Sequence, residues 1–312
     1  MQRSDMYSSD GLVYESARIK DYSEGYVKVL GYWLFYRSFG EPGPNGTVLC
    51  IHGGPGGGQG GMTRLAKLSE DGFRVVMYDQ LGAGRSDKPA SELLYSMERY
   101  VEEMEGVRQT LGLGKVHLWG GSFGAFLNVA YAVKYPKNLA SLMLSSGTSS
   151  CPFAISEMMR LRREAPGWVS ESLDKYEGLK DLRNPEYLKA VDYLYKKYTC
   201  SLDPLPPGVH LPGETRLEET NFVYRLMWGA HEFYPTGNSK YWDVTSQLGN
   251  IDCPTLITCG EYDEITPRNS ELLHSGIRKS KLHIFEGCTH SAAREKPEEY
   301  YQVHRDFLKS LA

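Results

Sequence analysis

The sequence predicts an α/β protein with a doubly wound, mostly parallel sheet and an inserted helical cap. Two observations lead to this expectation. Short buried-strand candidates alternate with helix candidates through residues 47–147, and the alternation returns from residue 254 onward. Between these parts, residues 151–240 offer helical segments and no clear strand. We therefore expect a core at residues 1–147 and 241–312, and a helical cap at residues 148–240.

Length and composition narrow the class of protein. A chain of 312 residues with 41% hydrophobic content can bury a sizeable core. Because the net charge is -4 and no long basic run occurs, neither nucleic acid nor a membrane is an expected partner. Residues 1–15 are polar, are expected to be loosely held, and lack the apolar stretch of a signal peptide. Six scattered cysteines without a C-x-x-C spacing indicate reduced thiols in the cytoplasm.

The first part of the chain supplies the expected elements of the sheet in turn. In residues 19–39, apolar and polar side chains alternate over short stretches that are separated by turn-forming residues, and this pattern predicts a β-hairpin. Apolar runs too short for helices predict buried strands, whereas apolar residues spaced by three and four predict helices. The expected strands are residues 47–51, 73–78, 116–119 and 139–144, and the expected helices are residues 62–71, 97–112 and 123–135.

The later part of the chain first supplies the cap and then completes the sheet. The expected cap helices are residues 153–164, 168–176, 185–198 and 217–228, with a stiff Pro-rich loop at residues 204–208. The α/β alternation resumes at Pro254. The last expected strands are residues 255–259 and 282–285, and the last expected helices are residues 269–276 and 297–311.

The centre of the predicted core is a G-x-S-x-G motif, Gly120 to Gly124, between a buried strand and a helix. In this context the motif is typical of a nucleophile elbow, a sharp turn that raises a serine at the carboxyl end of a strand. Gly120 and Gly124 lack a Cβ because the turn crowds the residues on both sides of Ser122. Ser122 is therefore the expected nucleophile.

Two glycine-rich loops follow earlier strands. His52 to Gly58, sequence HGGPGGG, lets backbone amides approach a ligand closely, as an oxyanion hole requires. We expect His52 to hold this loop by hydrogen bonds and not to act as the base. Asp79 to Ser86 does not match a phosphate-binding motif and is interpreted as a structural turn.

A serine nucleophile needs a histidine base, and that histidine needs a carboxylate to fix its tautomer. Of the eight histidines, only His290 lies in a loop directly after a late strand. Asp263 follows the preceding strand in the same way, with Glu261 as its substitute. We therefore predict the triad Ser122, Asp263 and His290, in the chain order of α/β-hydrolases.

The expected oxyanion donors are the backbone amides of Phe123 and Gly54, with Gly53 as the second choice. No cofactor is needed for this chemistry. No metal is expected either, because no cluster of histidine, cysteine and glutamate offers a site for one.

The motifs together resemble a known family, the α/β-hydrolase aminopeptidases called proline iminopeptidases. The quoted segments fall in that family's order over nearly the whole chain: HGGPG at 52–56, DQLGAGRS at 79–86, GGSFGA at 120–125, GEYDEITP at 260–267 and THSAAREKP at 289–297. The resemblance implies a serine exopeptidase that acts on short peptides or aminoacyl substrates with a free N-terminus.

The resemblance also implies residues that hold the substrate's amino group. Family members use two glutamates for this purpose, and Glu232 and Glu264 match them here. Two carboxylates could compensate a ligand ammonium in a water-poor pocket. Aromatic residues of the first-residue pocket are expected among Phe123, Trp228, Phe233 and Tyr234. The sequence departs from the family at Ala125, and at Ala230-His231, where Pro-x is more usual before the glutamate.

Two other functions stay open at this stage. The same triad without amine recognition would serve an esterase, a lactonase or an amino-acid amidase, because G-x-S-x-G does not distinguish these reactions. A non-catalytic ligand-binding protein on the same fold is the third hypothesis, since fold does not fix function. The preferred first residue, Pro or a small apolar or aromatic one, and the oligomeric state are not determined by the sequence.

Overall fold

The computed structural model describes residues 22–206 and 221–311. Several expectations fall partly or wholly outside these residues. They are the loosely held residues 1–15, the start of the hairpin at residues 19–21, the end of the Pro-rich loop at residues 207–208, and the helix start at residues 217–220. Within the described residues, no helix is long and apolar enough to cross a membrane.

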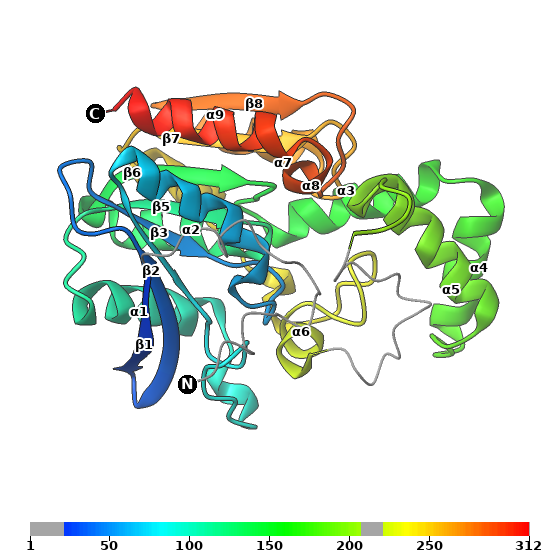
Figure 1. The fold of residues 1–312 in the computed structure, drawn as a ribbon. Helices are drawn as coiled ribbons and strands as arrows, with labels where there is room; N and C mark the ends of the chain where they lie inside the picture. Colours follow the sequence, from blue (N-terminus) through cyan, green and yellow to red (C-terminus); the bar gives the residue numbers. More distant parts are fainter. Residues whose placement is uncertain (1–21, 207–220, 312) are drawn as a thin grey trace.

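An eight-stranded sheet forms the centre of the molecule, in the order β1-β2-β4-β3-β5-β6-β7-β8 (Figure 1). The hairpin strands β1 and β2 pair antiparallel, β2 also pairs antiparallel with β4, and the other neighbours pair parallel. The expected doubly wound, mostly parallel sheet is thereby confirmed. The strands are β1 (Tyr22–Val29), β2 (Tyr32–Phe39), β3 (Thr47–Ile51), β4 (Arg74–Tyr78), β5 (Val116–Gly121), β6 (Leu139–Ser145), β7 (Thr255–Gly260) and β8 (Ser280–Phe285).

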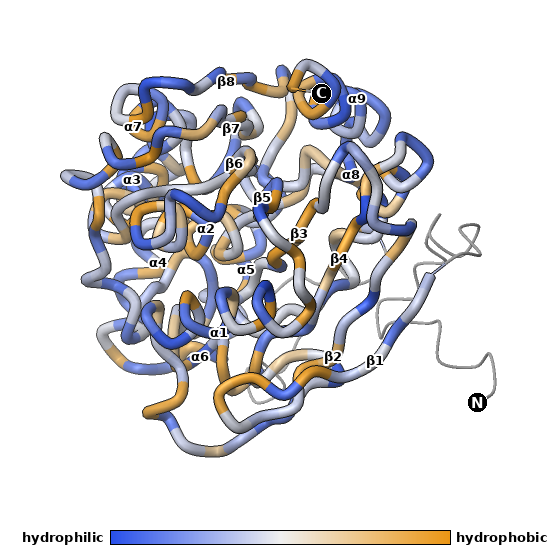
Figure 2. The backbone as a smooth tube through the Cα atoms, turned by 90° about the vertical axis from the view of Figure 1, so that its left-hand side faces the viewer, coloured by the Kyte–Doolittle hydropathy of each residue, from blue (hydrophilic) through white to orange (hydrophobic). Residues whose placement is uncertain are grey.

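Alternate residues of the central strands enter two hydrophobic clusters. In β3, Leu49 and Ile51 join the cluster that contains helices α1 and α2, whereas Val48 and Cys50 join the one that contains α9. This alternation follows from the two-residue period of a strand that is covered on both faces. The hydrophobic colour of β3 and β4 in Figure 2 marks these buried strands. The helices around the sheet are α1 (Met97–Thr110), α2 (Phe123–Lys134), α7 (Pro267–Gly276), α8 (Ala292–Glu295) and α9 (Pro297–Lys309).

Helices α3 to α6 lie beyond the carboxyl ends of the strands, on the side to which the arrowheads point in Figure 1. We call residues 148–240 the cap. Its described part contains no strand of the sheet, and Ser150 and Asp243 form an isolated bridge at its base. The cap helices are α3 (Cys151–Glu164), α4 (Gly167–Gly178), α5 (Pro185–Leu194) and α6 (Phe222–Met227), and a π-helical turn (Tyr195–Thr199) follows α5.

Two elements differ from their predicted form. The helix expected at residues 62–71 is a 3₁₀ helix that begins at Gln59, where Gly60 and Gly61 favour no regular α-helical turn. The helix expected at residues 185–198 ends at Leu194 and continues as the π-helical turn. Hydrophobic spacing does not separate these helix types, because all of them return a side chain to the same face after three to five residues.

Candidate active site

Ser122 occupies a tight turn between β5 and α2. Its backbone has φ 55° and ψ -129°, which is uncommon for a residue with a side chain. A Cβ on Gly120 would lie 2.5 Å from the carbonyl oxygen of Gly124. A Cβ on Gly124 would lie 2.2 Å from the carbonyl oxygen of Ile51. Both glycines of the motif are therefore required by the packing of the turn.

Hydrogen bonds connect the ends of three neighbouring strands and lead from Ser122 toward Asp263. The backbone N–H of Ser122 donates to the carbonyl of Ser145 at 2.8 Å, and that of Ser146 donates to Thr258 at 2.7 Å. The Ser146 hydroxyl then donates to Asp263 Oδ2 at 2.6 Å. Ser146, which the sequence did not single out, therefore fixes the carboxylate of Asp263 to the strand that lies next to Ser122.

Asp263 and His290 form a buried pair. Asp263 is 1% exposed, and its Oδ1 lies 2.7 Å from His290 Nδ1. The same oxygen accepts the backbone N–H of Ile265 at 2.8 Å. Because the Asp263 carboxylate only accepts hydrogen bonds, the proton lies on His290 Nδ1 and donates to it. Nε2 of His290 is then the nitrogen available to take a proton.

Negative charge surrounds the imidazole of His290. Its Nε2 lies 3.8 Å from Glu264 Oε1. Burial alone would lower the pKa of His290, but the charges of Asp263, Glu264 and Glu232 outweigh burial and raise that pKa to about 10. At neutral pH the imidazole therefore holds its second proton. A cation that neutralised these carboxylates would lower this pKa.

The glycine-rich loop after β3 lies against the serine. A Cβ on Gly53 would be 2.9 Å from Ser122 Cβ and 3.5 Å from its Oγ. Gly54 has φ 117°, a conformation that favours glycine. Phe123 is the first residue of α2, so its backbone N–H is among those without a partner in the helix. The two expected oxyanion donors thus belong to segments that both adjoin Ser122.

His52 holds the glycine-rich loop, as expected. The backbone N–H of Gln80 donates to His52 Nε2 at 3.0 Å, and the Gln80 side-chain amide donates to the His52 carbonyl at 2.8 Å. On the other side of the ring, Nδ1 lies 2.8 Å from the Gly53 carbonyl oxygen and 3.1 Å from the backbone nitrogen of Gly58, so it joins both ends of the loop. Burial lowers the pKa of His52, which keeps the ring neutral. The Asp79–Ser86 turn is structural too: Asp79 accepts the backbone N–H of Gln59.

The two predicted glutamates lie close enough to His290 and to each other to interact electrostatically. Glu264 is 1% exposed, and burial followed by the charge of Glu232 raises its pKa well above the usual range. Burial also raises the pKa of Glu232, while the charge of His290 acts against this. The structure thus brings Asp263, Glu264, His290 and Glu232 together, although they come from the core and the cap.

A π-helical turn of the cap, Tyr195–Thr199, touches three of these residues. The Thr199 hydroxyl donates to Glu264 Oε2. The backbone N–H of Glu232 donates to the Tyr195 hydroxyl at 3.1 Å, and that of His290 donates to the Tyr198 carbonyl at 2.9 Å. Sequence reasoning missed this turn. The only local signal is the dense tyrosine pattern at the end of a predicted helix.

The predicted aromatic residues have different environments. Trp228 packs against Phe126 at 6.0 Å between ring centroids, and its indole N–H donates to the Glu232 carbonyl at 3.3 Å. Phe233 is fully buried beside Tyr195 and Tyr198, so its ring offers no accessible surface to a ligand.

The other two aromatic residues differ from each other in exposure. Tyr234 is partly exposed, next to His231 at 6.2 Å between ring centroids. Phe123 is 2% exposed, because it packs on Phe126 at the start of α2.

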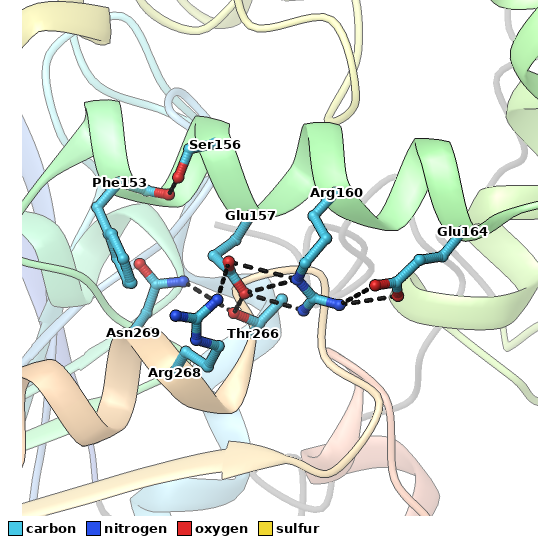
Figure 3. A network of polar contacts seen from close by, with 8 residues as sticks. All are labelled: Phe153, Ser156, Glu157, Arg160, Glu164, Thr266, Arg268 and Asn269. Carbon is cyan, nitrogen blue, oxygen red and sulfur yellow. Dashed lines mark hydrogen bonds and ion pairs between the residues drawn. The ribbon is translucent and has the colours of Figure 1, made fainter.

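A buried glutamate connects the cap to the loop after β7 (Figure 3). Glu157, on α3, is 3% exposed and accepts hydrogen bonds from the Thr266 hydroxyl at 3.0 Å and from Arg268 at 2.7 Å. Arg160, one turn further along α3, pairs with Glu157 at 2.9 Å. Because Thr266 closely follows Asp263 and Glu264, this network fixes the loop that carries both carboxylates.

Comparisons with known proteins identify a matching family and several relatives. The family described as the alpha/beta hydrolase fold matches residues 46–297. The proline iminopeptidase of Saccharolobus solfataricus is 39% identical over 92% of this chain and 93% of its own length. Two solved structures each cover 93% of this chain. They are VinJ, with 29% identity, 99% of its own chain covered and a TM-score of 0.86, and the proline iminopeptidase of Mycobacterium smegmatis, with 28%, 98% and 0.84.

Proposed function

Because the chain belongs to the proline iminopeptidase family of α/β-hydrolases, we propose that it is a serine exopeptidase that releases an N-terminal residue, foremost proline, from short peptides. The observation that carries this proposal is the pair of acidic side chains, Glu232 and Glu264, beside the hydrogen-bonded Asp263 and His290. An esterase that does not bind an amine would gain nothing from two further carboxyl groups there, because burying them costs desolvation energy and their charge holds a proton on His290.

In the proposed reaction, Ser122 Oγ attacks the carbonyl carbon of the first residue while His290 Nε2 takes the hydroxyl proton. Asp263 stabilises the imidazolium through Nδ1. The backbone amides of Phe123 and Gly54 are the proposed donors to the oxyanion, and the loss of one such donor typically costs about 3 kcal/mol. His290 returns its proton to the leaving amine. Water, deprotonated by His290, then hydrolyses the acyl-enzyme and regenerates Ser122.

The free amino group of the substrate is proposed to bind between Glu232 and Glu264. An ammonium compensates the charge of these carboxylates, and a blocked N-terminus does not. The same ammonium lowers the pKa of His290 by offsetting the negative charge around it, so a correct substrate also prepares the base. Trp228 and Tyr234 are the proposed aromatic neighbours of the first residue, with Phe123 and Phe233 packed behind them.

A panel of substrates tests this function. Prolyl, alanyl and phenylalanyl naphthylamides should be hydrolysed, with the prolyl compound preferred, and their N-acetylated forms should not. Equal turnover of free and acetylated compounds would reject amine recognition and leave an esterase or amidase. Failure of Ser122 to react with a fluorophosphonate would reject the serine mechanism altogether.

Two further expectations remain proposals of the same kind. We place the core at residues 1–147 and 241–312 and the cap domain at residues 148–240, on the basis of where the helices α3 to α6 interrupt the α/β alternation. We place the protein in the cytoplasm, because all six cysteines are buried free thiols, as suits a reducing compartment.

A further inference from the structure

The cap contains a closed ring of hydrogen bonds that the proposed reaction does not use. The backbone N–H of Phe233 donates to His231 Nδ1 at 3.2 Å, so the proton of this neutral imidazole is on Nε2. Nε2 lies 2.7 Å from the Tyr187 hydroxyl, which donates in turn to Glu177 Oε1 at 3.3 Å. The other oxygen of Glu177 accepts from Arg162 at 3.0 Å. Arg162 closes the ring by donating to the Phe233 carbonyl at 3.1 Å.

The ring is built from separate parts of the cap. Arg162 lies on α3, Glu177 on α4 and Tyr187 on α5, while His231 and Phe233 lie in the loop after α6. Tyr187 and Phe233 are fully buried, and His231 is 3% exposed. Burial, followed by the nearby charge of Arg162, lowers the pKa of His231 to about 3. Its ring therefore stays neutral, and the donor and acceptor roles above hold at every physiological pH.

The ring encloses the residue that follows Glu232. Both polar backbone groups of Phe233 are held by ring side chains, His231 and Arg162. Both polar backbone groups of Glu232 are also held by side chains, those of Tyr195 and Trp228. Side chains thus hold the backbone of this loop, in place of the backbone hydrogen bonds of a regular helix or strand.

We propose that Arg162, Glu177, Tyr187 and His231 act together as a positioning ring that aims Glu232 and thereby sets the affinity for a free amino terminus. This inference rests on the proposed function. It gives a role to His231, which follows Ala230, the residue that stands where the family usually has a proline two positions before the glutamate. A proline restricts the backbone by its own covalent ring, whereas here a hydrogen-bonded ring restricts it.

Tyr187→Phe is the sharpest test, because it removes only the hydroxyl that His231 and Glu177 share. The matched control is Tyr193→Phe on the same helix: Tyr193 is half-buried against Trp168 and lies outside the ring. We expect Tyr187→Phe to raise KM for prolyl naphthylamide about tenfold and to change kcat little, while hydrolysis of a neutral N-acetylated ester stays unchanged. Tyr193→Phe should change none of these. Equal KM values for wild type and Tyr187→Phe would overturn the inference, and so would equal increases in both variants.

His231→Asn is the second variant and serves if Tyr187→Phe does not fold. Its side-chain oxygen can still accept the Phe233 N–H, but it is too short to reach Tyr187. The same rise in KM, seen with the free-amine substrate and not with the neutral N-acetylated ester, supports the inference. A loss of kcat on both substrates overturns it. The proposed function fails separately: in that case the wild-type enzyme itself does not distinguish free from acetylated substrates.

Discussion

The sheet and the cap hold their site residues by different means. Ser122, Asp263 and His290 each follow a parallel strand. Hydrogen bonds between neighbouring strand ends fix Ser122 and, through the Ser146 hydroxyl, Asp263, which in turn holds the His290 ring. Glu232 lies in an irregular loop of the cap that is held by side chains from several helices. The reacting groups are thus placed by the topology of the sheet, whereas recognition of the substrate depends on side-chain contacts within the cap. The two tasks should therefore be separable by mutation.

The largest effect is expected on the sheet side. Ser122→Ala removes the proposed nucleophile and should lower kcat on the order of 10⁶-fold, for free-amine substrates and neutral N-acetylated esters alike. Steady-state kinetics with both substrates measure this, and an unchanged thermal midpoint shows that the fold is intact. A loss confined to free-amine substrates would contradict the division between sheet and cap.

A smaller and selective effect is expected on the cap side. Glu232→Ala removes one carboxylate that the ligand ammonium is proposed to meet, which costs about 2–3 kcal/mol, or roughly 30–160-fold in kcat/KM. Neutral N-acetylated esters should be hydrolysed as before, because they carry no ammonium. The two values of kcat/KM, determined on one preparation, test this. Parallel losses on both substrates would mean that Glu232 serves the chemistry instead of recognition.

Residues of both the sheet and the cap influence the protonation of His290, which a pH profile can measure. Glu264 belongs to the charges that raise the pKa of His290, and kcat/KM of a neutral ester increases as the free enzyme loses that proton. Glu264→Gln removes a negative charge, so the pKa of His290 falls and the rising limb should move to lower pH by about one unit. The variant Glu261→Gln, on an exposed neighbour, is the control. A limb that stays in place, or moves to higher pH, would contradict this account.

The smallest effect is expected for the connection between the two regions. Glu157→Gln keeps the size of the side chain but removes the charge that meets Arg160 and Arg268. Arg268 is exposed and Arg160 is partly exposed, so solvent screens the pairs and the free energy of unfolding should fall by only about 1–2 kcal/mol. Urea denaturation measures this loss. Activity should fall slightly and equally for both substrates, since the network supports Asp263 and Glu264 together; a selective loss would assign Glu157 to recognition alone.

The same contrast explains what the sequence could and could not predict. The strand at residues 47–51 was predicted with its observed ends, because all its residues are apolar or buried between two layers. The elbow at Ser122 was recognisable because its glycines are needed locally, within a few residues of the serine. The fold class and the family were confirmed for the same reason: sheet topology and the loops at strand ends leave short, ordered motifs.

The cap left weaker signals. Thr199 is 65 positions from Glu264, and Arg162 is 71 positions from Phe233, so no local pattern indicates either contact. Each of these residues has a common role in an ordinary helix, as a capping hydroxyl or a surface cation. Only the packing of the cap brings Thr199 to Glu264, and Arg162 to the loop that carries Glu232. Side-chain networks of this kind must be observed, because propensity and periodicity describe one element at a time.

The turn Tyr195–Thr199 has a consequence for how large a substrate can be. Its Tyr198 carbonyl holds the backbone of His290, while Tyr195 and Thr199 hold the two glutamates. Lifting the cap far enough to admit a folded chain would pull this turn away and release the base at the same moment. We therefore expect the protein to act on short peptides and not on folded chains.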